Sequence, residues 1–284
     1  MGEAPKRITV PWIRECRARH ERLAMVTAYD YPSARLADTA GVDMILVGDS
    51  VAMVVLGHAD TLSVTMDEML HHVKAARRGT QRALLVADMP YGSFHLGPAQ
   101  AVDNALRFVK EGGAAAVKIE GARVDVVAAL VDAEIPVMGH VGLTPQSIHK
   151  FGGFKVQGRG PEARAALLEA ARALEGAGAF SLVLECIPSA LAAEVTGALS
   201  IPTIGIGAGA DCDGQVLVFH DLLGIEERIA PRFVRRYAQI GHDAREALAA
   251  YVADVRSGAF PSEAESFEDP STPRPQTVDR LYGA

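Results

Sequence analysis

The chain has 284 residues, of which 49% are hydrophobic and 22% are charged, a composition typical of a soluble globular protein. Its formal net charge of −7 at pH 7 argues against nucleic-acid binding, which requires a concentrated basic surface. No apolar run approaches the ~20 residues of a membrane helix, the first residues do not resemble a signal peptide, and the three cysteines are scattered. We therefore predict a cytoplasmic protein with no membrane or nucleic-acid partner.

A short amphipathic helix capped by Thr9 is expected first, followed by eight apolar runs that mostly alternate with helical segments. The apolar runs cover residues 24–30, 42–50, 83–90, 114–121, 135–140, 181–186, 201–206 and 215–220. Because these runs are apolar on both faces, they are typical of strands in a parallel sheet that helices cover on both sides.

Several helices are predicted from local start signals. Residues 33–40 form a helical segment that stops at Gly41, and Thr65 and Glu68 have the spacing of a capping box. Pro98 and Pro161 stand where a helix can begin, since the first turn does not need the missing N–H. A long helix is predicted over residues 231–256.

Eight strands alternating with helices predict an α/β fold, a (β/α)8 TIM barrel. An open doubly wound sheet is the alternative, but no GxGxxG motif follows the first strand and acidic residues are spread over many strand ends. We predict one TIM-barrel catalytic domain over residues 1–267. Residues 268–284 are rich in proline and poor in apolar residues, so this tail is predicted to be disordered or draped over the domain.

The fourth apolar run carries Lys118 and Glu120 two positions apart, so on a strand both side chains point to the same face. They could form an ion pair inside the barrel, because buried charges are rarely left unpaired, or they could belong to an active site. An active site is favoured because four other runs also end in an acidic residue. These residues are Asp30, Asp49, Asp88 and Glu185.

In TIM barrels, functional groups lie at the carboxyl ends of the strands. Several carboxylates at one rim would repel each other unless a cation lay among them, and oxygen ligands favour Mg²⁺ first and Mn²⁺ next. Asp30 is the exception, because capping the following helix is its expected role. His140 is expected to line the site, whereas His71 and His72 are expected on a helix surface.

Two glycine-rich loops could reach this rim. Residues 152–160 combine four glycines with Lys155 and Arg159, which suits either a mobile cover that contacts an anion or an ordinary flexible connection. Residues 205–209 could present backbone N–H groups to an anion, although glycines also serve close packing.

Taken together, the ordered motifs resemble those of the ketopantoate hydroxymethyltransferase family. The resemblance extends from about residue 8 to residue 267, and the loop after Gly57 and the tail beyond Phe267 depart from the commoner patterns. It rests on 46–50 (LVGDS), 87–90 (ADMP), 117–121 (VKIEG), 139–147 (GHVGLTPQS), 152–160 (GGFKVQGRG), 184–186 (LEC) and 205–209 (GIGAG).

The resemblance implies a TIM-barrel enzyme with one Mg²⁺ in each subunit. It implies transfer of a one-carbon unit from 5,10-methylenetetrahydrofolate to 3-methyl-2-oxobutanoate, giving 2-dehydropantoate for pantothenate and coenzyme A synthesis. The partners implied are therefore a small 2-oxo acid and a folate, and the implied assembly is a homo-oligomer, a decamer.

Matching positions carry the family's residue roles to this chain. The resemblance implies that Asp49, Asp88 and Glu120 bind the metal. It implies that Asp49, Ser50, Asp88 and Lys118 bind the oxo acid. Glu185 corresponds to the general base, the catalytic residue.

These roles make chemical sense, because a 2-oxo acid can chelate Mg²⁺ and the metal would stabilise the enolate formed when Glu185 removes the C3 proton. Lys118 would add positive charge beside the substrate oxygens. Two rival hypotheses are a Mg²⁺-dependent 2-oxo acid lyase of the same fold, which needs no folate, and a non-catalytic oligomeric barrel. The latter predicts that the rim acids are absent, whereas this sequence has them.

Overall fold

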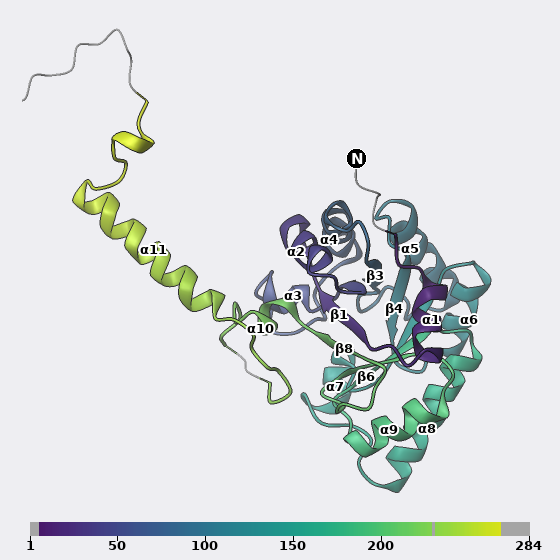
Figure 1. Ribbon diagram of the computed structural model, residues 1–284. Coiled ribbons are helices and arrows are strands. Elements are labelled where there is room, and N and C mark those ends of the chain that lie inside the picture. The colour runs from purple at the N-terminus through teal and green to yellow at the C-terminus, as the bar shows by residue number, and fades with distance from the viewer. Residues whose placement is uncertain (1–5, 229–230, 268–284) are drawn as a thin grey trace, which may run out of the picture. The chain divides into compact units, whose positions relative to one another are not determined.

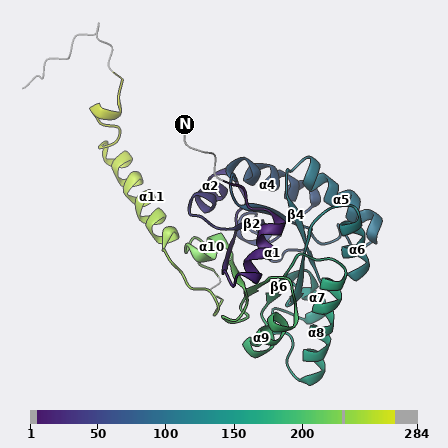
Figure 2. The same cartoon turned by 45° about the vertical axis from the view of Figure 1, so that its right-hand side comes forward.

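A computed structural model describes residues 6–228 and 231–267 of the chain. Eight parallel strands form a closed barrel in chain order, and the pairing of the first strand with the last closes it. Figures 1 and 2 show helices wrapped around this ring of strands. The predicted (β/α)8 TIM barrel is therefore confirmed.

The strands are short and lie close to their predicted places. They are β1 Leu23–Thr27, β2 Met44–Val47, β3 Leu84–Asp88, β4 Ala116–Glu120, β5 Val137–Gly142, β6 Ser181–Glu185, β7 Thr203–Ile206 and β8 Gly214–Leu217. The helices of the same unit are α1 Val10–Ala18, α2 Tyr31–Thr39, α3 Val51–Val54, α4 Met66–Gly79, α5 Pro98–Lys110, α6 Val124–Asp132, α7 Ile148–Phe151, α8 Pro161–Gly176, α9 Ser189–Ala198 and α10 Phe219–Leu222.

The helix-start signals in the sequence are confirmed. Thr9 Oγ1 accepts a hydrogen bond from Trp12 N and caps α1. Thr65 and Glu68 form both hydrogen bonds of the capping box at the start of α4. Proline stands in the first turn of α5 and of α8, where its missing N–H costs the helix nothing.

Among the boundaries that differ from prediction, two have a visible cause in a tertiary hydrogen bond. The predicted eighth strand extended to His220, but β8 ends at Leu217 because the Phe219 N–H turns away from the ladder and donates to Thr27 Oγ1. The long helix predicted from residue 231 begins at Ile240 instead. In the intervening segment Tyr237 N–H donates to Leu222 O, and this contact to α10 replaces a helical hydrogen bond.

The core has two parts, and their arrangement leaves the carboxyl end of the barrel for function. The larger cluster packs the strands against the outer helices. A smaller cluster fills the barrel interior and includes Ile13 and Cys16 of α1. The Arg17 guanidinium fixes α1 by pairing with Asp213, just before β8, and by donating to Leu199 O at 2.6 Å. Thus α1 covers the amino ends of the strands.

Residues from 239 onward belong to a second compact unit, whose described part contains α11 Ile240–Ser257 and a 3-10 turn, Glu263–Glu265. No residue of α11 is buried. The unit boundary after Ala238 lies inside the predicted catalytic domain of residues 1–267, and that domain assignment stays a prediction. The predicted disorder of residues 268–284 concerns a segment outside the described residues.

No described helix combines the length and apolar character needed to cross a bilayer.

Candidate active site

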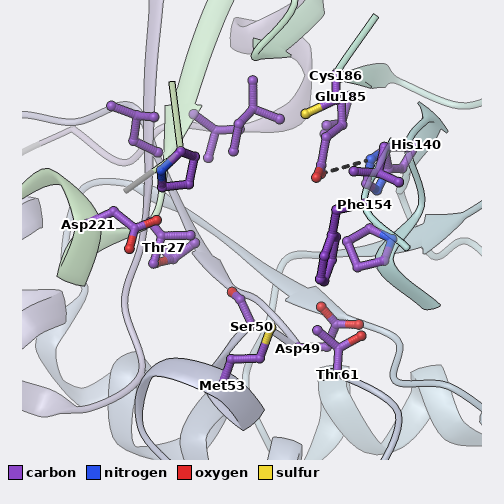
Figure 3. Close-up of a pocket in the computed structure, with 18 of the residues that line it drawn as sticks. Thr27, Asp49, Ser50, Met53, Thr61, His140, Phe154, Glu185, Cys186 and Asp221 are labelled. Atoms are coloured by element: carbon purple, nitrogen blue, oxygen red, sulfur yellow. Dashed lines mark ion pairs between the residues drawn. The ribbon is translucent and has the colours of Figure 1, made fainter. Parts of the chain in front are cut away.

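A pocket of about 510 Å³ opens at the carboxyl ends of the strands (Figure 3). Its polar end holds acidic and basic side chains from five neighbouring strands, and most of them are at most 5% exposed. These residues are Asp49, Asp88, Lys118, Glu120, His140 and Glu185. The structure therefore brings every acid that was predicted for the site to one pocket.

Parallel pairing explains this convergence. Asp88, Glu120 and Glu185 are the last residues of β3, β4 and β6, and carboxyl ends of parallel strands meet at one edge. Glycine at position 142 is required for the approach of β5 to β6, because a Cβ there would lie 2.2 Å from Glu185 O. Its φ of +100° is also a conformation that side-chain-bearing residues rarely adopt.

Lys118 does form a buried ion pair, but its closer partner is Asp88. The Nζ atom lies 2.8 Å from Asp88 Oδ1 and 3.9 Å from Glu120 Oε1. Asp88 and Lys118 are direct partners across β3 and β4, whereas Lys118 and Glu120 are two residues apart along one strand. Burial disfavours the ammonium, yet the charges of Asp88, Glu120 and Asp49 raise the pKa of Lys118 above its usual range.

Negative charge is poorly compensated around Asp49 and Asp88. Burial and then the charges of Asp88 and Glu120 raise the pKa of Asp49 well above its usual value. Burial also raises the pKa of Asp88, although Lys118 opposes that shift. The Asp49 N–H donates to Asp88 Oδ2 at 3.2 Å, which joins the ends of β2 and β3.

Gln146 is a site residue that sequence reasoning missed. Its Nε2 donates to Asp49 Oδ2 at 2.8 Å and to Met89 O at 2.9 Å, while its backbone N–H donates to Glu120 Oε2 at 2.9 Å. It thereby fixes two of the predicted metal ligands. The only available signal was the motif at residues 139–147, which contains Gln146 but does not say what it contacts.

His140 lines the pocket as predicted, and it lies between two carboxylates. Its Nε2 is 3.3 Å from Glu185 Oε2, the ion pair drawn in Figure 3, and its Nδ1 is 3.6 Å from Glu120 Oε1. Burial and the Lys118 charge oppose protonation of His140, but the adjacent carboxylates of Glu120 and Glu185 outweigh them and raise its pKa to about 9. Burial likewise opposes ionisation of Glu120, but the adjacent His140 ring and Lys118 ammonium keep its pKa low.

The proton positions on His140 can be read in two ways. Lys118 Nζ lies 3.3 Å from Nδ1, a contact that would suit a neutral ring accepting from the ammonium. We favour the protonated ring, because the ammonium has a closer anionic partner in Asp88 and a carboxylate faces each ring nitrogen. The ring then holds the Glu185 carboxylate toward the pocket.

Ser50 and Asp30 occupy different environments. Ser50 lines the pocket at the start of α3, and its Oγ lies 2.8 Å from Tyr29 Oη. Asp30 caps α2, as predicted, and is not among the pocket residues. The surface location predicted for His72 is wrong, because its half-buried ring hydrogen-bonds Tyr29 O through Nδ1 at 2.7 Å.

The two glycine-rich loops lie beside the pocket in different ways. Phe154, Lys155 and Val156 of the first loop line it, which supports the predicted position but does not test the predicted motion. In the second loop, a Cβ at Gly207 would meet the Phe233 ring at 2.9 Å and Cys186 Sγ at 3.2 Å. Close packing therefore explains that glycine.

The donor chemistry of the polar end fits a hard divalent cation, since it offers carboxylate oxygens and an excess of negative charge. The buried Gln146 Oε1 accepts no hydrogen bond within the described part of the chain. However, no group of three or more His, Cys, Asp or Glu side chains among residues 6–228 and 231–267 is arranged to hold a metal ion. The Lys118 ammonium, within 3.9 Å of both Asp88 and Glu120, already supplies a positive charge beside these carboxylates.

The outer end of the pocket contains Asp221, which the sequence did not single out. Burial and then the charge of Glu226 raise its pKa to about 6. The folded-state pKa of Asp221 lies above the unfolded value of about 3.9, so protonation of Asp221 stabilises the folded protein. This stabilisation is fully present below about pH 4 and is lost as the pH rises through 6.

We expect Asp221→Asn to raise the midpoint of thermal unfolding at pH 8 and to leave it unchanged at pH 4, since asparagine carries no charge at either pH. Scanning calorimetry at both pH values measures the effect. Asp211→Asn is the matched control, because Asp211 is exposed and lies outside the pocket. A lower midpoint for Asp221→Asn at pH 8 would contradict the prediction.

Comparison with known proteins decides the family. The sequence profile of the family described as ketopantoate hydroxymethyltransferase matches residues 7–263. The chain belongs to this family. It is therefore an enzyme, a hydroxymethyltransferase, with the barrel and the acidic rim described above.

Similar sequences agree with the family over nearly the whole chain. A 3-methyl-2-oxobutanoate hydroxymethyltransferase from Carboxydothermus hydrogenoformans is 52% identical over 278 residues, covering 97% of this chain and 99% of the relative. The protein of the same name from Pelobacter propionicus is 54% identical over 269 residues, covering 94% of this chain and all (100%) of the relative.

Solved structures of distant proteins share the barrel. A 2,3-dimethylmalate lyase of the PEP mutase/isocitrate lyase superfamily superposes with a TM-score of 0.58 at 19% identity, covering 91% of both chains. A phosphonopyruvate hydrolase in complex with oxalate and Mg²⁺ gives a TM-score of 0.56 at 15% identity, covering 90% of this chain and 93% of that one. At such identities these likenesses show that this family member shares their fold.

Proposed function

We propose that this chain transfers a hydroxymethyl group from 5,10-methylenetetrahydrofolate to 3-methyl-2-oxobutanoate and forms 2-dehydropantoate. Family membership supports the reaction class. The observation that carries the substrate assignment is the buried cluster in which Lys118, Asp88 and Asp49 face one pocket. A small 2-oxo acid carries adjacent carboxylate and keto oxygens, and such a cluster offers both positive charge and metal-binding oxygens to them.

We further propose that Asp49, Asp88 and Glu120 hold Mg²⁺, which when bound supplies a Lewis acid for the substrate oxygens. Lys118 of β4 and Ser50, which follows β2, contact the oxo acid from two sides of β3. The ammonium offers positive charge, and the serine hydroxyl offers one hydrogen bond. An anionic substrate would give the Lys118 ammonium another anionic partner, so that its charge would no longer be compensated mainly by Asp88.

Glu185 is proposed to take the C3 proton of the oxo acid. The electrons of the C3–H bond then move into the C2–C3 bond, and negative charge develops on the keto oxygen near Lys118. His140 orients the Glu185 carboxylate through the 3.3 Å contact. The resulting enolate carbon forms a C–C bond to the methylene carbon of the folate, which enters from the outer end of the pocket. Both C–N bonds of that carbon break: water supplies the hydroxyl group and one proton, the proton taken by Glu185 supplies the other, and tetrahydrofolate leaves.

Product formation tests the proposal directly. The enzyme is incubated with 3-methyl-2-oxobutanoate with and without 5,10-methylenetetrahydrofolate, and with and without EDTA. We expect 2-dehydropantoate only when folate is present and EDTA is absent. Turnover of the oxo acid without any folate would favour a 2-oxo acid lyase, and a lack of turnover under all conditions would favour a non-catalytic barrel.

We predict that Glu120→Gln weakens Mg²⁺ binding by at least about 10-fold, because an anionic oxygen ligand becomes neutral. Calorimetric titration with Mg²⁺ measures the change. Glu111→Gln is the control, since the Glu111 carboxylate pairs with Lys74 outside the pocket. Unchanged Mg²⁺ affinity would remove Glu120 from the ligand set.

Assembly as a homo-oligomer, with ten subunits suggested by the resemblance, stays a prediction, as does the cytoplasmic location. Mass measurement in solution would determine the subunit number.

A further inference from the structure

The Ser50 hydroxyl does not have the helix-capping role that its position suggests. Ser50 occupies the N-cap position of α3, but its side chain makes no capping hydrogen bond. Its Oγ instead lies 2.8 Å from the Tyr29 hydroxyl, on the pocket wall where Figure 3 shows Ser50. The Tyr29 hydroxyl therefore controls the direction in which the Ser50 hydroxyl points.

Tyr29 belongs to a chain of hydroxyl groups that begins at a backbone N–H. The Phe219 N–H donates to Thr27 Oγ1 at 3.0 Å, and the Tyr29 hydroxyl lies 2.8 Å from Ser50 Oγ. The Thr27 side chain also acts on the Tyr29 phenol, whose pKa it lowers as a hydrogen-bond donor would. Thr27 and Tyr29 are 3% and 1% exposed, so bulk water does not satisfy their protons. Burial has the larger effect and raises the pKa of Tyr29 above its usual range, so the phenol keeps its proton.

We infer one order of donation along these hydroxyl groups. A backbone N–H can only donate, so Thr27 Oγ1 accepts from Phe219 and retains its own proton, which we assign to Tyr29 Oη. With that assignment, Tyr29 gives its own proton to Ser50 Oγ across the 2.8 Å contact, whose geometry is compatible with either oxygen as donor. In this order each buried donor of the chain has an acceptor, and the Ser50 proton remains to be donated into the pocket.

The position of Tyr29 is fixed from both sides. Its N–H lies 3.3 Å from Ser33 Oγ of α2, and its C=O contacts His72 Nδ1 of α4 at 2.7 Å. Thus both polar backbone groups of this residue are held by side chains of the surrounding helices. The phenol is a rigid donor, and Ser50 has little freedom to reorient.

We propose that Thr27 and Tyr29 are positioning residues that direct the Ser50 hydroxyl proton to an anionic oxygen of the ligand. The nature of that ligand, the carboxylate of a 2-oxo acid, rests on the proposed function. The alternative role of Tyr29 is core packing alone, in which its hydroxyl has no connection to ligand affinity.

A double-mutant cycle separates the two roles. Binding of 3-methyl-2-oxobutanoate in the presence of Mg²⁺ is measured by calorimetry for the wild type, Tyr29→Phe, Ser50→Ala and the double variant. We expect each single change to weaken binding about 3- to 10-fold, the value of one hydrogen bond. The double variant should bind no more weakly than Ser50→Ala, because both changes interrupt one chain.

Multiplicative losses in the double variant, or unchanged binding by Tyr29→Phe, would overturn the inference. Failure of the wild type to bind the oxo acid would instead overturn the proposed function. Tyr31→Phe is the matched control, because the Tyr31 hydroxyl accepts from Arg35 at the surface and does not line the pocket.

Variants of Thr27 test the chain at its other end. Thr27→Val removes the hydroxyl and should weaken oxo-acid binding about as much as Tyr29→Phe does. Thr27→Ser keeps the hydroxyl and should restore affinity to within about 2-fold of the wild type. Equal affinities for Thr27→Val and Thr27→Ser would show that the hydroxyl chain does not act on the ligand, even if Tyr29→Phe folded poorly.

Discussion

Glu185→Gln is expected to slow the exchange of the C3 proton of 3-methyl-2-oxobutanoate with deuterated water by about 10²- to 10⁴-fold. Glutamine has the shape of glutamate but cannot accept the proton. Oxo-acid binding should remain mostly intact, because the deeper group around Lys118 and Asp88 is unchanged. The loss should therefore appear in the rate and not in the affinity.

Proton NMR of the substrate in deuterated water follows this exchange without any need for folate, so it isolates the first chemical step. Glu194→Gln is the matched control, since Glu194 lies on α9 and pairs with Arg164 outside the pocket. Exchange at the wild-type rate in Glu185→Gln would remove Glu185 from the role of base.

Asp88→Asn is expected to lower product formation by about 10²- to 10³-fold, the typical cost of removing one electrostatic group from an active site. Asp88 has two functions in the structure. It is the closest anion to the Lys118 ammonium, at 2.8 Å, and it receives the Asp49 N–H that joins β2 to β3. Asparagine keeps the shape of the side chain. It removes the negative charge that pairs with Lys118 and that would bind the proposed metal.

Steady-state turnover and Mg²⁺ titration of the same variant measure the two effects together. Asp30→Asn makes the same chemical change at the end of another strand, where the side chain caps α2. Because asparagine caps helices as well as aspartate does, this control should keep wild-type turnover. Full turnover and unchanged Mg²⁺ affinity in Asp88→Asn would refute the proposed metal site.

The fold could be predicted because its signals are local. Each strand is a short apolar run, and a capping residue or a first-turn proline begins several helices. The failures occurred where a distant partner decides the local structure. The run through His220 has strand-like composition, but the hydrogen bond from Phe219 N–H to Thr27 Oγ1 ends β8 early.

The acidic residues of the site could also be located from sequence, since a parallel barrel gathers all carboxyl ends at one rim. Their individual roles depend on contacts between strands. The sequence placed Lys118 beside Glu120, whereas the register of β3 and β4 gives it Asp88 as its nearest anion.

Thus the sequence by itself determined the barrel, the acidic rim and, through its motifs, the family. Only the tertiary structure decided which charges pair, how Gln146 joins Asp49 to Glu120, and how a hydroxyl chain reaches Ser50. The physical reason is the distance along the chain over which each kind of interaction acts. Strand and helix signals act between residues a few positions apart, whereas hydrogen bonds and charge pairs in the pocket join residues tens of positions apart, whose separation is set by how the strands align.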